Sequence, residues 1–266
     1  MAKSMEKQRL NKVVEKLNSF EPITLAEMDG VSLMNRTDTK FVFDIKLLPE
    51  ILSAVQPYYK SLEIKGNRFA NYKTDYFDTL DFYMFTAHQN GKQNRYKIRY
   101  REYVGSDLSF LEVKFKNNKG KTLKTRIKSW VDMNKIDNDD AKFLHNATPF
   151  NMDKLKHVLT NEFSRITLVS KTDKERLTID FSLSFAKDSK LKNLDELVIA
   201  EVKQEKVNRN SKVMQVLKEH GIRKASFSKY ASGATLLNQQ LKYNQFKSKM
   251  LYLNKIHKDY GVIWNR

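Results

Sequence analysis

The chain has 266 residues, of which 40% are hydrophobic, so it can bury the core of one large domain or two small ones. Its formal net charge of +18 at pH 7 predicts an acidic partner such as nucleic acid, an anionic membrane or a phosphate-rich ligand. The absence of cysteine excludes disulfides and cysteine-based zinc sites. The sequence has no run of about 20 apolar residues, so no transmembrane helix is expected.

The first part of the chain alternates between amphipathic helices and strands. Asp44 is a candidate N-cap for a helix at 47–55, and Asp78 is a candidate cap for a short aromatic helix at 82–88. The periodicity of apolar residues predicts helices at 5–17, 47–55 and 82–88, and strands at 36–43 and 71–77.

The middle of the chain is rich in hairpin signals, because Gly-containing and Asn-containing turns separate short alternating segments. A polar stretch at 138–160 is predicted to be helical. The remaining segments are predicted to be strands, at 95–101, 111–116, 123–128, 165–169, 176–185 and 197–204.

The C-terminal part is predicted to be helical. One helix spans residues 211–220 and is stopped by Gly221. From Ser228 a long basic helical tail is expected to run to about Ile256. We therefore expect a domain at residues 1–240, which includes the N-terminal amphipathic helix, and a basic helical tail at 241–266.

The segment Arg95-Tyr96-Lys97-Ile98-Arg99-Tyr100-Arg101 alternates strictly between a cation and an apolar residue. This period of two predicts a β-strand with one apolar face and one face of four like charges, which repel one another. A solvated surface strand would be the simpler interpretation of this segment taken alone.

Five other strand candidates repeat the pattern, and several add a carboxylate to the cationic face. The amphipathic helices need an apolar sheet face to cover, which leaves the cationic face for a lumen or a cleft. Many antiparallel strands with peripheral helices predict an α+β fold around a curved or closed sheet that binds a polyanion. The residues that share one strand face in these five segments are Arg36, Asp38 and Lys40; Glu112, Lys114 and Lys116; Lys124, Arg126 and Lys128; Arg176, Thr178 and Asp180; and Glu201 and Lys203.

Taken in order, these segments resemble the VTC-type polyphosphate polymerase domain, a member of the triphosphate tunnel metalloenzymes and a relative of the CYTH phosphatases. The resemblance covers roughly residues 34–237. The matching motifs are Asn35-Arg36-Thr37-Asp38-Thr39-Lys40-Phe41, Asp75-Tyr76-Phe77-Asp78-Thr79, residues 95–103, Leu111-Glu112-Val113-Lys114, residues 120–126, Arg176-Leu177-Thr178-Ile179-Asp180, Ala200-Glu201-Val202-Lys203 and Phe227-Ser228-Lys229-Tyr230.

The resemblance implies an antiparallel β-barrel, the triphosphate tunnel, with peripheral helices and a basic interior that holds phosphate chains. It implies transfer of the γ-phosphoryl group of ATP to a growing inorganic polyphosphate, with Mn²⁺ or Mg²⁺. Carried over by motif, the residues that contact the phosphates in catalysis are Lys40, Arg99, Arg101, Lys114, Lys124, Arg126, Arg165 and Arg176. Further substrate contacts are expected from Lys97, Lys203, Ser228 and Lys229.

Glu201 is the main metal ligand that the resemblance implies, with Glu112 as the next candidate. The first strand departs from the family pattern, because it has Asn35 and Asp38 where many tunnel enzymes have glutamates. Glu112 has a second interpretation as a structural partner of Lys114 or Arg101. Asp180 is interpreted as orienting a neighbouring arginine.

Two other functions stay open at this point. The same tunnel could belong to a phosphohydrolase that cleaves tripolyphosphate or nucleoside triphosphates, or to a non-catalytic polyphosphate-binding protein. RNA binding is not expected, because Tyr96 and Tyr100 lie on the face opposite the cations, whereas base stacking requires aromatic residues beside them. The lack of cysteine and of an apolar N-terminal stretch favours a cytoplasmic protein.

Overall fold

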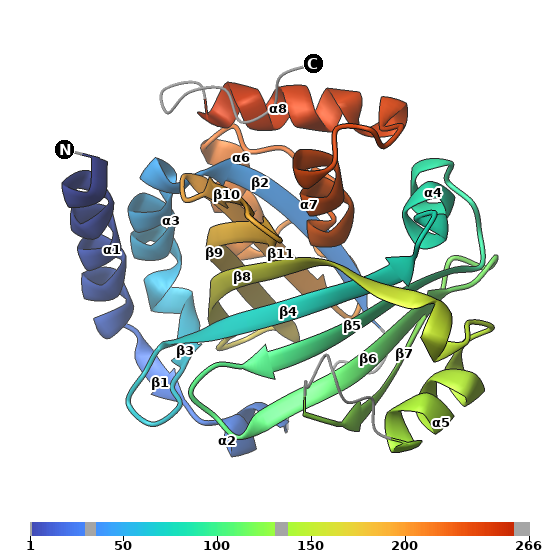
Figure 1. Cartoon of the computed structure of the whole chain (residues 1–266). Coiled ribbons are helices and arrows are strands. Elements are labelled where there is room, and N and C mark those ends of the chain that lie inside the picture. The colour runs from blue at the N-terminus through green and yellow to red at the C-terminus, as the bar shows by residue number, and fades with distance from the viewer. Residues whose placement is uncertain (1, 30–35, 131–137, 258–266) are drawn as a thin grey trace.

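Eight strands form one continuous antiparallel path in the order β2–β11–β9–β8–β4–β5–β6–β7, in a computed structural model that describes residues 2–29, 36–130 and 138–257 (Figure 1). Three short strands extend it: β3 and β10 pair with β8 and β9, and β1 runs parallel to β3. The strands are β1 (Glu21–Ile23), β2 (Thr37–Asp44), β3 (Tyr59–Leu62), β4 (Phe69–Thr79), β5 (Arg95–Tyr103), β6 (Leu108–Lys116), β7 (Thr122–Lys128), β8 (Leu155–Ser170), β9 (Glu175–Lys187), β10 (Lys190–Leu194) and β11 (Leu197–Gln204).

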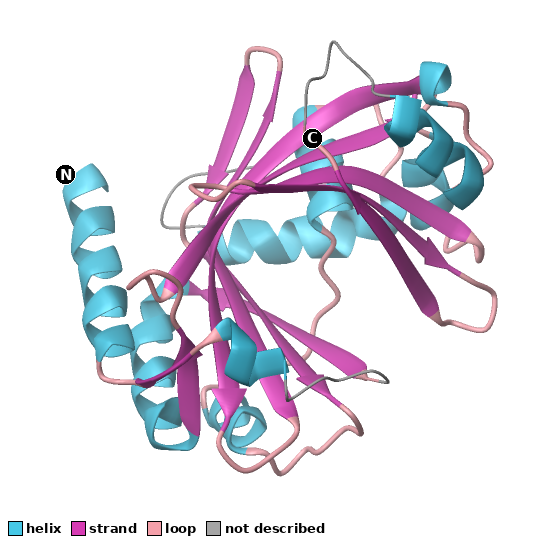
Figure 2. Ribbon diagram, turned by 90° about the horizontal axis from the view of Figure 1, so that it is seen from below, coloured by secondary structure: helices cyan, strands magenta, loops and turns pink. Residues whose placement is uncertain are grey.

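The sheet bends so that its two halves face each other, which Figure 2 shows from below. Within the described residues β2 and β7 are the two ends of the path and do not pair, so the curved sheet is not closed into a complete barrel. The predicted α+β class, with an antiparallel sheet and peripheral helices, is confirmed. The helices are α1 (Ala2–Asn18), α2 (Leu25–Asp29), α3 (Leu48–Val55), α4 (Tyr83–Gln89), α5 (Asn138–Ala147), α6 (Lys212–Glu219), α7 (Lys229–Leu237) and α8 (Lys247–His257).

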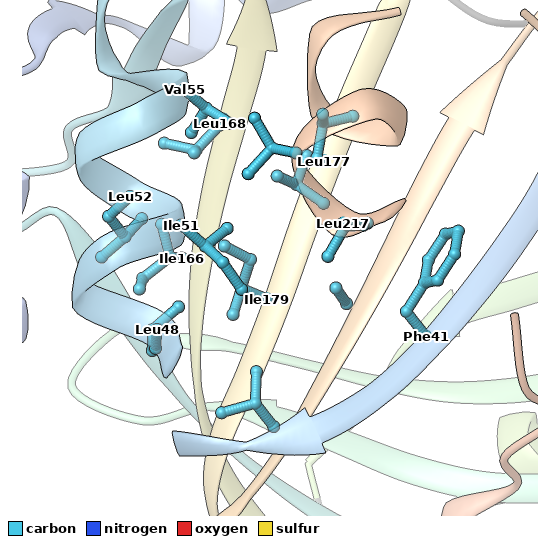
Figure 3. Packing of buried hydrophobic residues seen from close by; sticks show 14 of the residues in the cluster. Phe41, Leu48, Ile51, Leu52, Val55, Ile166, Leu168, Leu177, Ile179 and Leu217 are labelled. Atoms are coloured by element: carbon cyan, nitrogen blue, oxygen red, sulfur yellow. The ribbon is translucent and has the colours of Figure 1, made fainter. Parts of the chain in front are cut away.

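The largest core cluster lies on the convex side of β2, β11, β9 and β8, beneath α1, α3 and α6. Figure 3 shows α3 laid against this side of the sheet, with Ile51 and Val55 on the side of the helix that faces the strands. Each fully buried aliphatic side chain of this kind contributes roughly 1.5–3 kcal/mol through burial. The side chains labelled there are Phe41, Leu48, Ile51, Leu52, Val55, Ile166, Leu168, Leu177, Ile179 and Leu217.

A second hydrophobic cluster on the convex side shows which way the cationic face of β5 points. Ile98 and Tyr100 of β5 are buried with Leu111 of β6, and α4 and α5 cover them with Met84 and Leu144. Because side chains alternate along a strand, the cations of β5 point to the opposite, concave side of the sheet. This is the orientation that the sequence predicted.

Helix α7 is buried almost completely and packs on β8, β9 and β10, with α8 lying across it at one end of the sheet (Figure 1). A Cβ atom on Gly233 would lie 2.5 Å from Cδ1 of Phe185, so the helix approaches β9 as closely as glycine permits. Met250 and Leu253 of α8 are buried in the same cluster. The proposed boundary at residue 240 stays a prediction, as does the separate role of the tail.

Two predictions of secondary structure are wrong in part. The stretch 138–160 is helical only to Ala147, and from Leu155 it belongs to β8. The predicted single helix from Ser228 to Ile256 is two helices, α7 and α8, separated by residues 238–246, where only a short 3₁₀ turn at Asn244–Phe246 is regular. Asn35 and residues 258–266, on which parts of two predictions fell, lie outside the described residues.

The two predicted caps are confirmed in a modified form. Asp44 Oδ1 accepts a hydrogen bond of 2.9 Å from the backbone N–H of Lys46 at the 3₁₀ turn that leads into α3. Asp78 accepts hydrogen bonds of 2.9 Å from the backbone N–H groups of Met84 and Phe85 in the first turn of α4. None of the described helices is long and apolar enough to span a bilayer.

Candidate functional site

Cross-strand register brings the predicted cations of β5, β6 and β7 together on the concave side. Lys97 lies opposite Lys114, which in turn lies opposite Lys124. The next row holds one carboxylate, because Arg99 lies opposite Glu112 and Glu112 opposite Arg126. One wall of the concave surface is therefore two adjacent rows of cations around Glu112.

The facing wall is built in the same way from β2, β11, β9 and β8. Lys40 lies opposite Glu201, Lys203 opposite Arg176, and Arg165 opposite Asp180. Glu112, Asp180 and Glu201 come from three different strands, and each one sits among cations. Asp38 of β2 lies on the same face, opposite Lys203.

The first turn of α7 bridges the two walls. Lys97 Nζ of β5 donates a hydrogen bond of 3.0 Å to Ser228 Oγ, while Lys229 Nζ pairs with Asp180 of β9. Ser228 also caps α7 by accepting from the backbone N–H of Ala231. The C-terminal half of the chain thus delivers two of the predicted residues to a surface made by strands.

We call this surface the basic face. It unites every site residue that the sequence predicted, and the structure adds Asp180 to them. Its members are the eleven cations Lys40, Lys97, Arg99, Arg101, Lys114, Lys124, Arg126, Arg165, Arg176, Lys203 and Lys229, the carboxylates Glu112, Asp180 and Glu201, and the hydroxyl of Ser228.

Each carboxylate of the basic face is held by two cations. Glu201 lies 2.9 Å from Lys40 Nζ and 2.7 Å from Lys203 Nζ. Asp180 accepts a bidentate pair of hydrogen bonds from Arg165, at 2.5 and 2.8 Å, and also pairs with Lys229. This is the arginine-orienting arrangement that the sequence suggested for Asp180.

Glu112 has partners other than the two expected ones. Its Oε2 accepts hydrogen bonds of 2.7 and 2.6 Å from Nε and Nη2 of Arg99, and its Oε1 pairs with Lys124. Lys114 and Arg101 were the predicted partners. Register explains the difference, because Arg99 lies directly opposite Glu112 whereas Arg101 lies opposite Phe110.

The carboxylates are ionised despite their burial. Burial alone would raise the pKa of Glu112, but the charges of Arg99, Arg101 and Lys124 outweigh it and lower the pKa to about 2. Burial opposes ionisation of Asp180 and Glu201 as well, and the adjacent lysines and Arg165 hold the pKa of both well below the usual range.

The cations of the basic face lie close together and outnumber the carboxylates that could neutralise them. Burial, and then the charges of Lys40, Arg95 and Arg99, lower the pKa of Lys97 to about 7. Arg99 and burial lower the pKa of Lys114 well below its usual range, and burial followed by Arg99 and Arg165 lowers that of Arg101 to about 10. An anion bound among these groups would stabilise their charged forms.

Sequence reasoning missed an aromatic support beneath the cations. Tyr72 and Phe163 stack with their ring centroids 5.1 Å apart. Arg101 and Arg165 lie 5.4 and 5.2 Å above the Tyr72 ring, and Lys229 Nζ lies 4.2 Å from the Phe163 centroid. These cation–π contacts fix the direction of three long side chains. Tyr72 alternates with Thr74 and Tyr76 along β4, which was the available signal for its face.

The donor set suits a hard divalent cation only in part. Its acidic ligands are carboxylate oxygens, which Mg²⁺ and Mn²⁺ prefer. The described residues contain no group of three or more His, Asp or Glu side chains that could hold a metal alone. A metal at Glu201 would therefore take most of its remaining ligands from bound phosphate oxygens and water.

Comparison with protein families matches this chain to a known domain. The family model of the VTC domain matches residues 35–238, which include the whole of the basic face. The comparison with curated proteins gives no significant match.

Three solved structures are similar to this chain over about three quarters of its length. A candidate adenylate cyclase from Bacillus halodurans is 16% identical, with 75% of this chain and 98% of that chain covered and a TM-score of 0.44. HpAC1 from Hippeastrum, a candidate adenylyl cyclase described as having a dominant triphosphatase activity, is 13% identical, with 76% and 96% covered and a TM-score of 0.49. The PH1819 protein from Pyrococcus horikoshii is 14% identical, with 75% and 95% covered and a TM-score of 0.42.

Proposed function

This chain belongs to the VTC domain family, and from that premise we propose that it is an ATP-dependent polyphosphate polymerase. The observation that carries the proposal is the basic face, where the eleven cations outnumber the carboxylates Glu112, Asp180 and Glu201 and also Asp38, which lies opposite Lys203. A surface of this kind suits a ligand that carries one negative charge on every repeating unit.

The proposed reaction needs little covalent help from the protein. A terminal oxygen of the polyphosphate forms a bond to the γ-phosphorus of ATP, and the bond between that phosphorus and the β–γ bridging oxygen breaks, releasing ADP. The requirements are positioning and neutralisation of charge on the transferring group. Arg101 and Arg126 offer planar forks for phosphate oxygens, and Lys97, Lys114 and Lys124 offer point charges beside them.

Three of the lysine–carboxylate ion pairs of the basic face suggest how ligand binding proceeds. Lys40 and Lys203 neutralise Glu201, and Lys229 helps to neutralise Asp180. When phosphate oxygens approach, these lysines can turn toward them. Glu201 would then be free to hold Mn²⁺ or Mg²⁺, which would supply charge neutralisation between the phosphoryl groups.

Incubation of the purified protein with ATP and Mn²⁺, followed by a gel that resolves polyphosphate, tests the proposal. Long chains are the expected product, and Arg101→Ala should abolish most of the synthesis. Lys12→Ala, an exposed lysine on α1, is the matched control and should behave as wild type. Orthophosphate without chains would instead identify a phosphohydrolase, and no turnover with retained polyphosphate binding would identify a binding protein.

A further inference from the structure

A second lysine-rich site lies outside the basic face. A cavity of about 920 Å³ is lined by the end of β4, the start of β8, the β9–β10 hairpin and the C-terminal end of α7. Its lining includes four lysines, Lys156, Lys187, Lys190 and Lys192, and one carboxylate, Asp188, which pairs with Lys187 at 3.4 Å. Helix α7 separates it from the basic face, because Lys229 at one end contacts Asp180 while Leu237 at the other end lines the cavity.

The cavity also carries the two most exposed large apolar side chains among the described residues. Leu80 is 83% exposed and Leu191 is 60% exposed. Exposed apolar side chains that gather at one place indicate an interaction surface, whereas isolated ones need no explanation. We call Leu80, Leu191 and the four lysines the lysine–leucine surface.

Both leucines are presented by ordered backbone. Leu80 follows Thr79, whose Oγ1 donates to Asp81 at 2.6 Å and accepts from the backbone N–H of Tyr83 at 3.0 Å. Leu191 lies on β10 opposite Ala186 of β9, whereas Lys190 and Lys192 lie opposite Lys187 and Phe185. The leucine and these lysines therefore lie on opposite faces of the β9–β10 edge hairpin, and a bilayer reaches both when it meets the hairpin edge-on. The two side chains are thus held outward by a capped turn and a paired strand.

The charges of the surface select among possible occupants. A second copy of this chain related by a two-fold axis would bring the same lysines face to face, which disfavours self-association. An anionic bilayer offers an apolar layer for the leucines and headgroup phosphates for the lysines. We propose that the lysine–leucine surface docks this protein peripherally on an anionic phospholipid bilayer, with Leu80 and Leu191 entering the boundary between headgroups and acyl chains.

Co-sedimentation of the full chain with phosphatidylcholine vesicles, with and without phosphatidylserine, tests this proposal. Binding is expected only to the vesicles that contain phosphatidylserine, and Leu80→Ser/Leu191→Ser should weaken it about ten-fold, because the side chains removed are the ones that enter the bilayer. Leu25→Ser/Leu251→Ser is the matched control, since these leucines are 48% and 52% exposed elsewhere. Because all four are exposed, thermal unfolding should be unchanged.

A charge-matched pair isolates the lysines from the overall charge. Lys156→Gln/Lys192→Gln should lose vesicle binding, whereas Lys12→Gln/Lys92→Gln, which removes the same charge elsewhere, should retain most of it. Equal vesicle binding by Leu80→Ser/Leu191→Ser and wild type would overturn the proposal. A wild-type dimer that this variant cannot form would overturn it as well, because the surface would then bind a second copy of the chain. Binding of free glycerol phosphate in the cavity without vesicle binding would also overturn it. Polyphosphate synthesis in solution should be unaffected by either leucine variant, so this test is independent of the proposed function.

Discussion

Arg99 and Arg101 are neighbours on one face of β5, yet their surroundings differ. Arg99 is the main partner of Glu112, whose side chain is 0% exposed. Arg101 has no carboxylate within ion-pairing distance among the described residues; it contacts Thr74 Oγ1 at 3.4 Å and the rings of Tyr72 and Phe163. Sequence reasoning would treat the two arginines alike, whereas the ion pair separates a structural cation from a free one.

We therefore predict opposite consequences for the two alanine variants. Arg101→Ala should weaken tripolyphosphate binding by about 1.5–3 kcal/mol, the value of a charge-assisted hydrogen bond, with little loss of stability. Arg99→Ala leaves a buried carboxylate short of its main partner and should cost about 3–5 kcal/mol of unfolding free energy. Urea unfolding and titration calorimetry measure the two effects. Equal stability losses in both variants would contradict this assignment.

Lys97 predicts two opposite pH trends. Its pKa of about 7 in the folded chain lies below the ordinary value of 10.5, so between these values the unfolded chain holds more protons. The free energy of unfolding of the ligand-free protein should therefore rise with pH from about 7 toward 10.5. Anion binding favours the charged lysine, so tripolyphosphate affinity should fall over the same range. Both trends should be shallower in Lys97→Met; identical profiles would assign them to other groups.

Glu201→Gln separates metal binding from anion binding. The variant keeps the side-chain shape but loses the charge that holds Lys40 and Lys203, so those lysines become available to phosphates. We expect metal-free tripolyphosphate affinity to be equal or higher, and Mn²⁺-dependent turnover to be lost. Activity measured against metal concentration, beside calorimetry without metal, checks both. Wild-type metal dependence in this variant would move the metal site to Glu112.

At the scale of elements, α7 is fixed by its close approach to β9. Alanine favours a helix over glycine by about 1 kcal/mol, so a loosely packed helix would be stabilised by Gly233→Ala. Here the new methyl group would overlap Phe185, and we expect a net loss of about 1–3 kcal/mol. Urea unfolding measures it, and Phe185→Leu combined with Gly233→Ala should recover part of the loss. A stabilised Gly233→Ala variant would show that α7 can move away from the sheet.

The strands could be predicted from the sequence where alternation is strict, and this was enough to assign the faces of β5, β6, β7 and β11. Alternation failed to predict the start of β8, which was predicted to be helical. There the register of β8 against β4 shifts between Tyr76 and Phe77. Val158 and Leu159 are both buried there, so with Leu155 they imitate the spacing of a helix. Partners across strands, such as Arg99 with Glu112, depend on hairpin register, which one sequence does not specify.

At the scale of the whole molecule, the net charge of +18 predicts strong salt dependence. Counter-ions released from a polyanion and from the basic face favour binding at low salt, as they do for nucleic acids. Tripolyphosphate should raise the thermal unfolding temperature at low ionic strength, and its affinity should fall steeply as salt increases. Thermal unfolding across a salt series measures this. An affinity that is flat across the series would mean that few of the predicted cations contact the ligand.

The ion pairs of the basic face make the surface resemble an ion-exchange resin that is already loaded with its own counter-ions. Glu112, Asp180 and Glu201 are tethered to the chain and cannot diffuse away, so an incoming anion must compete with carboxylates at fixed high local concentration. An anion of low valence gains little from such an exchange. We expect a long chain of phosphates to displace Glu201 and Asp180 from their lysines in one binding event, so that the surface would discriminate by valence before any chemistry begins.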